Sequence, residues 1–153
     1  MELSVINPSL VLGPVLESDF GTSVELVKRF LNGGFPLAPN ISFGIVDVRD
    51  VAQLHLLALE SPQASGNRFI ASSETLAIPL ISEFLRKKIP EYQKRLPKGT
   101  APDFLIKLLG FFSPLMKTVA NQLGKTKELD NSKAKNILGC LLYTSPSPRD
   151  SRR

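Results

Sequence analysis

Short apolar runs alternate with amphipathic segments along the first ninety residues of the chain. The run from Glu2 to Asn7 predicts a strand that Pro8 stops. Phe43–Val46 and Gly66–Ser72 predict two further short strands. The segment NPSLVLGP lies between two prolines, and we expect it to be a loop. Three strands separated by helical segments are the start of an α/β pattern.

Helical periodicity fills the segments between these strands and most of the C-terminal half. Val24–Asn32 is predicted to be a helix that Thr22 or Ser23 caps and that Gly33 and Gly34 end. Ala77–Ile89 is predicted to turn Leu80, Ile81, Phe84 and Leu85 inward. The remaining predicted helices are Pro102–Phe112, Ser113–Leu123 and Asn131–Leu138, the last capped by Asp130 and ended by Gly139.

The stretch FGIVDVRDVAQLHLLALE, residues 43–60, predicts a strand end followed by a tightly capped helix. Asp47 is placed to cap the helix, and Asp50 three residues later resembles a capping box. The predicted buried stripe puts the single histidine of the chain on the core side, and it consists of Val48, Val51, Ala52, His55 and Leu59. Asp47 and Asp50 could also form a catalytic carboxylate pair, but capping accounts for both.

Length and composition fit one globular domain. The chain has 153 residues, of which 42% are hydrophobic and 22% charged. Together with the order of elements, this predicts an α/β fold with a helical end.

The last fifteen residues differ in composition from the rest. Cys140–Asp150, CLLYTSPSPRD, resembles a translated transposase sequencing adapter over eleven consecutive residues. We therefore expect residues 140–153 to be an adapter-derived, disordered tail, and the lone cysteine not to be native. Residues 1–139 then carry a formal charge of +3 instead of the +5 of the whole chain.

Several classes of function are disfavoured by what the chain lacks. No basic run exceeds three residues and there is no tryptophan, so we expect no nucleic-acid binding. One cysteine and one histidine leave no internal disulfide, no cysteine-based zinc site and no two-histidine metal site within one chain. We see no signal peptide and no apolar run of about 18 residues, and we expect a cytoplasmic protein. Neither a Gly-x-Ser-x-Gly elbow nor a Gly-x-x-x-x-Gly-Lys-Ser/Thr loop is present.

The segments VINPSLVLGPVL, FGIVDVRDVAQLHLLALESPQASGNRFIAS and ELDNSKAKNILG carry a family resemblance. In this order and spacing they resemble the C-terminal half of the extended short-chain dehydrogenases/reductases, within the branch of aldehyde reductases and dihydroflavonol reductases. The similarity spans residues 1–139. It implies the C-terminal part of a Rossmann-type fold: an incomplete parallel sheet with a helical substrate-side region.

The family's two chemical motifs are missing from the printed chain. Members carry Gly-x-x-Gly-x-x-Gly for the cofactor phosphates and Tyr-x-x-x-Lys for proton transfer. Here Tyr92 is followed four residues later by Leu96, and Tyr143 by Ser147. We therefore expect a piece of a longer NADP(H)- or NAD(H)-dependent carbonyl reductase, truncated at both ends. Alone it should have no catalytic residue, no strongly bound cofactor, no activity and poor folding, because its strands lack partners.

The resemblance does carry some binding residues over to this chain. Pro8, Ser9 and Leu10 match the loop that touches the nicotinamide end of the cofactor, largely through backbone atoms. Leu12, Phe20 and Ser23 match the stretch that lines the pocket for a small carbonyl substrate. The segment from Val46 to Ala52 and His55 match residues that support the pocket floor.

A reading from another class of function concerns the apolar segment Phe104–Met116, FLIKLLGFFSPLM. Lysines flank it, as in a helix that lies on a membrane surface, although Lys107 interrupts it and Pro114 breaks it. The alternative is therefore a non-enzymatic binding module with an apolar helix pair at a membrane surface.

Overall fold

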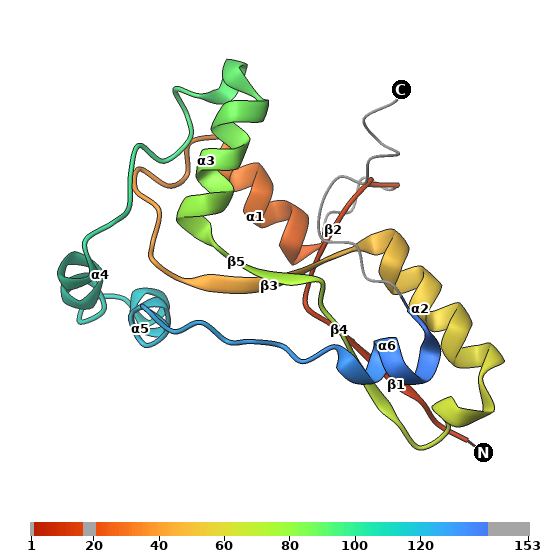
Figure 1. The fold of residues 1–153 in the computed structure, drawn as a ribbon. Coiled ribbons are helices and arrows are strands. Elements are labelled where there is room, and N and C mark those ends of the chain that lie inside the picture. The colour runs from red at the N-terminus through yellow and green to blue at the C-terminus, as the bar shows by residue number, and fades with distance from the viewer. Residues whose placement is uncertain (1, 17–20, 141–153) are drawn as a thin grey trace. The chain divides into compact units, whose positions relative to one another are not determined.

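The computed structural model describes residues 2–16 and 21–140. These residues form two compact units, which we treat separately. Of the described residues, the first unit contains 2–16, 44–75 and 128–140, and the second contains 21–43 and 76–127. Figure 1 shows the elements of both units in the order of the chain. Phe20 and residues 141–153, most of the predicted adapter tail, lie outside the described residues.

Parallel strands form the centre of the first unit, as the pattern predicts. Strand β1 (Val5–Pro8) pairs with β4 (Arg68–Ala71), with Val5 opposite Arg68. Strand β2 (Leu10–Leu12) pairs with β3 (Ser42–Asp47), with Leu10 opposite Ile45. The expected loop NPSLVLGP is therefore wrong in part. Pro8 ends one ladder, where its missing N–H costs little, and the apolar run after Ser9 starts a second strand.

The β1–β4 pair ends where β3 joins the sheet. Beyond Ala71, residues Ser72 and Ser73 lead into β5 (Glu74–Ala77), and the second sheet has the order β2-β3-β5. The strand β5 was not predicted. Ser9 N donates to Ala71 O at 2.9 Å, and Ser73 N donates to Ile45 O at 2.7 Å. The paired strands β1 and β4 therefore separate at these serines. β3 lies between β2, which follows β1, and β5, which follows β4.

Helix α2 (Val48–Glu60) has the predicted cap but not the predicted buried face. Asp47 accepts a hydrogen bond from Arg49 N at 2.8 Å, and Asp50 lies in the first turn. Leu54 is fully buried, whereas the predicted core residue His55 is exposed and its Nδ1 lies 2.8 Å from Val51 O. Of the predicted stripe, Val48, Ala52 and Leu59 are exposed as well. The helix has apolar residues on several sides, so its partner in the fold, not its own periodicity, selects the buried face.

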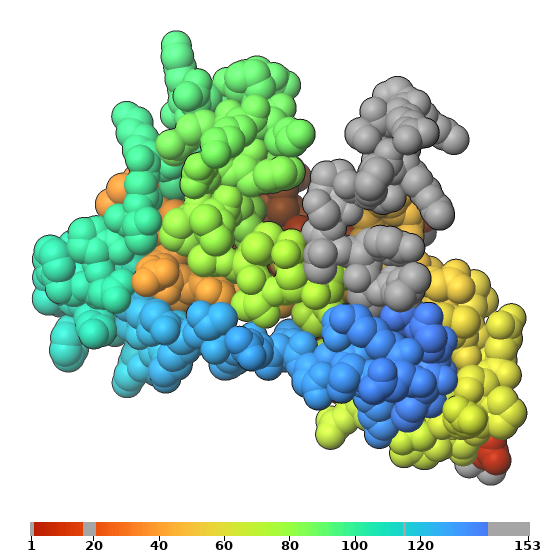
Figure 2. Space-filling model, in the orientation of Figure 1, coloured from red at the N-terminus to blue at the C-terminus, as the bar shows by residue number. Residues whose placement is uncertain are grey.

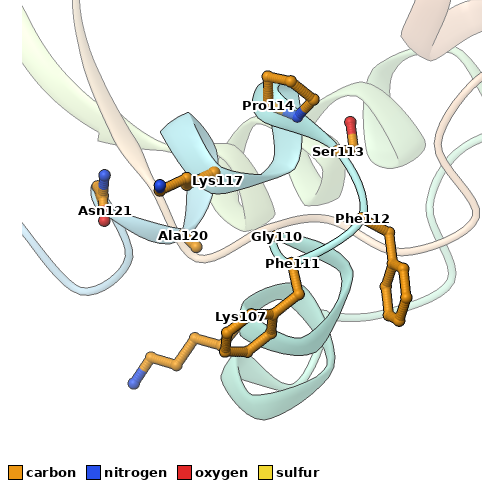
Figure 3. A pocket seen from close by; sticks show the side chains of 9 residues that line it. All are labelled: Lys107, Gly110, Phe111, Phe112, Ser113, Pro114, Lys117, Ala120 and Asn121. Atoms are coloured by element: carbon orange, nitrogen blue, oxygen red, sulfur yellow. The ribbon is translucent and has the colours of Figure 1, made fainter.

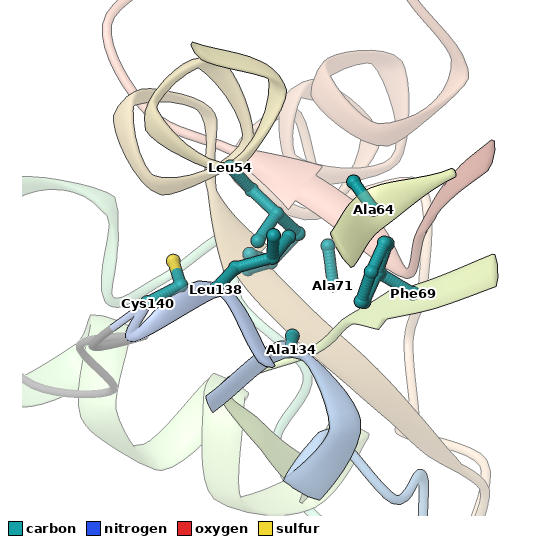
Figure 4. Packing of buried hydrophobic residues seen from close by; sticks show 8 residues of the cluster. Leu54, Ala64, Phe69, Ala71, Ala134, Leu138 and Cys140 are labelled. Carbon is teal, nitrogen blue, oxygen red and sulfur yellow. The ribbon is translucent and has the colours of Figure 1, made fainter. Parts of the chain in front are cut away.

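The core of the first unit lies between α2, β4 and α6 (Ser132–Leu138). Figure 4 shows its buried members, which are Val46, Leu54, Ala64, Phe69, Ala71, Ala134, Leu138 and Cys140. Figure 2 shows α6, in blue, against the yellow atoms of α2. The N-cap of α6 is Asn131 and not the predicted Asp130, although the Asp130 carboxylate accepts from Ser132 N at 2.8 Å. As predicted, Gly139 ends α6, with a left-handed φ of 63°. Burial raises the pKa of the Cys140 thiol.

The second unit packs α1 (Thr22–Leu31) and α3 (Ile78–Lys88) over a separate core, whose buried members are Phe30, Ala38, Ile41, Ile78 and Leu96. The cap of α1 is Gly21, not the predicted Thr22 or Ser23. In α3 the buried residues are Ile78 and Ser82, while the predicted inward residues Leu80 and Phe84 are exposed. The buried face of α3 is therefore rotated relative to the predicted one, because it includes Ile78 at the start of the helix.

The helical end of the second unit consists of two short helices, α4 (Asp103–Leu109) and α5 (Pro114–Ala120). Both are shorter than predicted, because Gly110 follows α4 and Pro114 must begin a new helix. Two 3₁₀ turns, η1 (Pro62–Ala64) and η2 (Pro90–Tyr92), complete the described elements. The prediction of an α/β fold with parallel strands and a helical end is thus confirmed.

Candidate functional site

The point where β1 and β4 separate is the candidate site, and we call it the strand split: Ser9, Gly44, Ser72 and Ser73. Ser9 follows the carboxyl end of β1, and Ser72 and Ser73 follow that of β4. Gly44 of β3 lies between them. A Cβ atom built on Gly44 would lie 2.7 Å from Ser72 Oγ and 3.1 Å from Ser9 Cβ. The lack of a side chain at Gly44 is therefore what allows the serines to approach β3 so closely.

Two hydroxyls of the strand split have no hydrogen-bond partner among the described residues. These are Ser9 Oγ and Ser73 Oγ, and both atoms are buried. A buried hydroxyl without a partner costs about 1–3 kcal/mol, so native proteins rarely retain one unless water or a ligand satisfies it. These two hydroxyls are the reason for taking the strand split as the candidate site.

The loop before α6 braces the strand split from the other side. Asn131 Nδ2 donates to Ser72 O at 2.6 Å, and the Leu129 side chain reaches Gly44, where Cδ1 would lie 2.5 Å from an added Cβ. These contacts join segments 59 residues apart and hold the Ser72 backbone in place. The position of the serines is thus set by tertiary packing.

The carboxylate at the carboxyl end of β3 is fully engaged by its neighbours. Asp47 Oδ2 lies 2.8 Å from Arg49 Nη2, and Asp47 Oδ1 accepts from Arg49 Nε at 2.9 Å. These side-chain hydrogen bonds lower the pKa of the Asp47 carboxyl, because they stabilise its charged form. A capping, paired carboxylate is a poor general base, which agrees with the structural role expected for Asp47.

The structure distributes the predicted binding residues unevenly. Pro8, Ser9 and Leu10 lie together at the strand split, where β1 passes into β2. Leu12 is the half-buried last residue of β2 in the first unit, and Ser23 is a half-buried residue of α1 in the second unit. Phe20 lies outside the described residues. The substrate pocket formed by Leu12, Phe20 and Ser23 therefore stays a prediction.

Sequence reasoning missed Gly44, Ser73 and Asn131 as members of the site. One signal was the pair Ser72-Ser73 directly after an apolar strand, where a turn is an equally good explanation. Gly44 within a strand run was a second signal, since such a glycine often marks a close approach of another chain segment.

Among residues 2–16 and 21–140, no group of three or more His, Cys, Asp or Glu side chains could hold a metal ion. In the same residues, no helix combines the length and apolar character needed to cross a membrane.

Comparisons with known proteins agree with the Rossmann-type arrangement. No family model matches the chain. The chain is 34% identical over 149 residues to the ketoreductase azaE of Aspergillus niger, covering 90% of this chain and 38% of that protein. It is 41% identical over 92 residues to cinnamoyl-CoA reductase 2 of Arabidopsis thaliana, covering 60% of this chain and 27% of the relative.

Solved structures extend the similarity to nearly the whole chain. The yeast methylglyoxal/isovaleraldehyde reductase in complex with NADPH superposes with a TM-score of 0.67 at 26% identity. This superposition covers 94% of this chain and 39% of the yeast protein. The chain therefore spans less than two fifths of the length of each of these three relatives.

The fold, the parallel strands and these relatives define the class. The chain is homologous to part of a Rossmann-type short-chain dehydrogenase/reductase, and the predicted family resemblance is confirmed. Within this class its relatives are reductases of the ketoreductase, cinnamoyl-CoA and methylglyoxal types.

Proposed function

We propose that the whole protein is an NAD(P)H-dependent oxidoreductase that reduces aldehydes or ketones, and that this chain forms its substrate-side part. The observation that carries the proposal is the pair of unpartnered hydroxyls, Ser9 Oγ and Ser73 Oγ, at the carboxyl ends of two parallel strands. Ligands of open α/β sheets bind beyond these strand ends. A ketoreductase relative over 90% of the chain supports the same reading.

The residues of the strand split suit the nicotinamide end of the cofactor. Its carboxamide is uncharged and offers both donors and an acceptor, which matches two neutral hydroxyls. Pro8 and Leu10 fix the backbone on either side of Ser9, and Ser9 N is already used by Ala71 O. The side chain of Ser9 is therefore the group left to orient the ring. When bound, the cofactor supplies the hydride for the carbonyl carbon.

This chain alone should neither hold the cofactor strongly nor complete the reaction. It contains no Tyr-x-x-x-Lys pair to give a proton to the carbonyl oxygen and no glycine-rich loop for the cofactor phosphates. We further propose a small carbonyl substrate for a pocket that includes Leu12, Phe20 and Ser23, a cytoplasmic location and no nucleic-acid partner. Whether the cofactor is NADP(H) or NAD(H) depends on residues that select the ribose phosphate, which follow the glycine-rich loop in this class.

A chimeric enzyme tests the proposal. Residues 2–139 of this chain replace the matching segment of the yeast reductase, which contributes its own cofactor loop and proton donor. We expect the chimera to reduce methylglyoxal or isovaleraldehyde with NADPH, measured by the loss of absorbance of the cofactor. The 153-residue chain alone should show no turnover. A folded chimera that binds NADPH but reduces no aldehyde or ketone would contradict the proposal, as would turnover by the chain alone.

Serine variants of the chimera test the role of the strand split. Removing one hydrogen bond worth about 0.5–1.5 kcal/mol should raise the KM for NADPH about 2–12-fold in Ser9→Ala or Ser73→Ala. Ser65→Ala, at a half-buried serine of the same unit outside the strand split, is the matched control and should leave KM unchanged. If the KM for NADPH is the same in all three variants, the serines of the strand split do not contact the cofactor.

A further inference from the structure

The α4 helix and the segment that joins it to α5 expose several large apolar side chains in the second unit. Phe104, Phe111 and Phe112 are 72%, 84% and 82% exposed, and Leu108 is half-exposed. Phe104, Leu108 and Phe111 follow one another at helical spacing on α4 and the turn after it, on the side away from buried Ile106. We call these four residues, Phe104, Leu108, Phe111 and Phe112, the phenylalanine face. Large exposed apolar surfaces of this kind mark interaction sites.

An open groove of about 870 Å³ adjoins the phenylalanine face. Figure 3 shows Phe111 and Phe112 on the segment that joins α4 to α5, with the Lys107 side chain extending from α4. Lys117 of α5 lines the same groove. The two helices approach closely at Gly110, where an added Cβ would lie 3.3 Å from Lys117 Cα. The surface therefore combines bulky apolar side chains with two cations on a compact helix pair.

The charge of the chain is concentrated in the unit that carries this surface. The second unit contains twelve lysines and arginines against four acidic residues, a formal charge of +8. The described residues of the first unit include four basic and seven acidic residues, a formal charge of −3. The modest charge of +5 for the whole chain hides this separation. The second unit should thus be drawn to an anionic partner.

We propose that the phenylalanine face docks on an anionic membrane surface, with Phe104, Leu108, Phe111 and Phe112 entering the headgroup region while Lys107 and Lys117 contact anionic lipids. Aromatic and aliphatic side chains flanked by lysines are the composition of helices that lie in the membrane interface. α4 and α5 have seven residues each, which suits lying on a bilayer and not spanning it. The proposal is independent of the reductase activity.

Charge complementarity favours lipid over the other occupants that the chain offers. A symmetric dimer through this face would bring Lys107 and Lys117 of one copy towards the same residues of the second copy, which is repulsive. Residues 141–153 carry three arginines against one aspartate, so they are repelled by the same lysines. An anionic lipid surface instead attracts each lysine that lies near it.

A tryptophan reporter tests the docking directly. The chain contains no tryptophan, so Phe111→Trp in the 153-residue chain introduces a single fluorescent probe in the phenylalanine face. We expect its emission to shift to the blue with phosphatidylcholine–phosphatidylserine vesicles, to shift less with pure phosphatidylcholine, and to lose the shift in high salt. Leu59→Trp in the first unit is the matched control, because Leu59 is 84% exposed like Phe111. It should not shift.

Co-sedimentation with the same anionic vesicles tests the individual contacts. Phe111→Asp and Phe112→Asp should each weaken vesicle binding roughly tenfold or more, since each replaces an exposed ring that would enter the headgroup region with a charge. Leu59→Asp makes the same charge change at equal exposure and should have no effect. Lys107→Glu and Lys117→Glu should weaken binding to anionic vesicles, whereas Lys135→Glu on α6 of the first unit should not.

Three outcomes would overturn the proposal. The first is equal loss of binding in Phe111→Asp and Leu59→Asp, which would mean non-specific adhesion. The second is a chain that ignores vesicles but sediments as a dimer that Phe111→Asp dissociates, which would make a second copy the occupant. The third is vesicle binding by the chain but not by the active chimera, which would mean that the rest of the enzyme covers this face.

Discussion

At the scale of single residues, Gly44 decides whether the strand split can form. β3 passes between Ser9 and Ser72 only because Gly44 has no side chain there. The Ser9 and Ser73 hydroxyls of the strand split are buried and have no hydrogen-bond partner among the described residues. The glycine thus links the packing of the sheet to the hydrogen-bonding groups of the candidate site.

Gly44→Ala should destabilise the protein. The added Cβ would lie 2.5 Å from Leu129 Cδ1 and 2.7 Å from Ser72 Oγ, so the loop before α6 or the strand split must shift. Overpacking of this kind typically lowers the free energy of unfolding by about 1–3 kcal/mol. Urea-induced unfolding of the chimera measures this loss. Gly99→Ala is the control, because nothing lies within 4 Å of the built Cβ. A Gly44→Ala protein as stable as Gly99→Ala would show that this approach is not tight.

The Asp47–Arg49 pair gives one helix cap a pH dependence. Hydrogen bonds from Arg49 lower the pKa of the folded Asp47 carboxyl below that of the unfolded chain. The unfolded chain therefore binds the proton more readily, and the stabilisation is complete above the unfolded pKa near 4. It is lost as the pH falls through the folded pKa.

Asp47→Asn should isolate this contribution, since asparagine caps a helix about as well as aspartate. We expect a loss of about 0.5–1 kcal/mol at pH 7, reduced for partial exposure of the pair, that shrinks as the pH falls below the unfolded pKa and vanishes below the folded pKa. Urea unfolding at several pH values measures it. The same substitution in an Arg49→Met background should show little pH dependence. A loss that stays constant from pH 7 to pH 3 would assign the effect to capping alone.

At the scale of elements, the sequence predicted helices and parallel strands better than their faces. The cap at Asp47, the end at Gly139 and the strands β1, β3 and β4 all follow from local signals. The strands β2 and β5 were missed because each has only three or four residues and pairing with β3 stabilises it. Neither Leu54 nor His55 could be assigned to the core from periodicity, because α2 is apolar on more than one side.

The face of α2 can be tested by a pair of adjacent substitutions. Leu54→Ala removes a fully buried side chain and should cost about 2–5 kcal/mol of unfolding free energy. His55→Ala changes an exposed side chain and should cost less than about 0.5 kcal/mol. Chemical denaturation of the chimera measures both. A larger loss of unfolding free energy in His55→Ala than in Leu54→Ala would support the buried face predicted from the sequence.

At the scale of the whole molecule, much of the candidate site could not be predicted. Ser9 was identified because it lies in a family motif directly after a strand. Ser73 and Asn131 join the site only through contacts between segments far apart in the sequence, which periodicity does not record. The charge separation between the two units was hidden for a related reason. The net charge of the chain adds up residues that the fold places in two different units.

The pairing of β1 with β4 also affects how the chain folds during its synthesis. Val5 pairs with Arg68, so β1 emerges from the ribosome some sixty residues before its partner. At about 5–20 residues per second this delay lasts roughly 3–13 s. During this time the β1 strand has no partner along its β4 edge, and α2 is made without the strand that later packs beside it. The nascent chain is then most open to chaperones and to self-association.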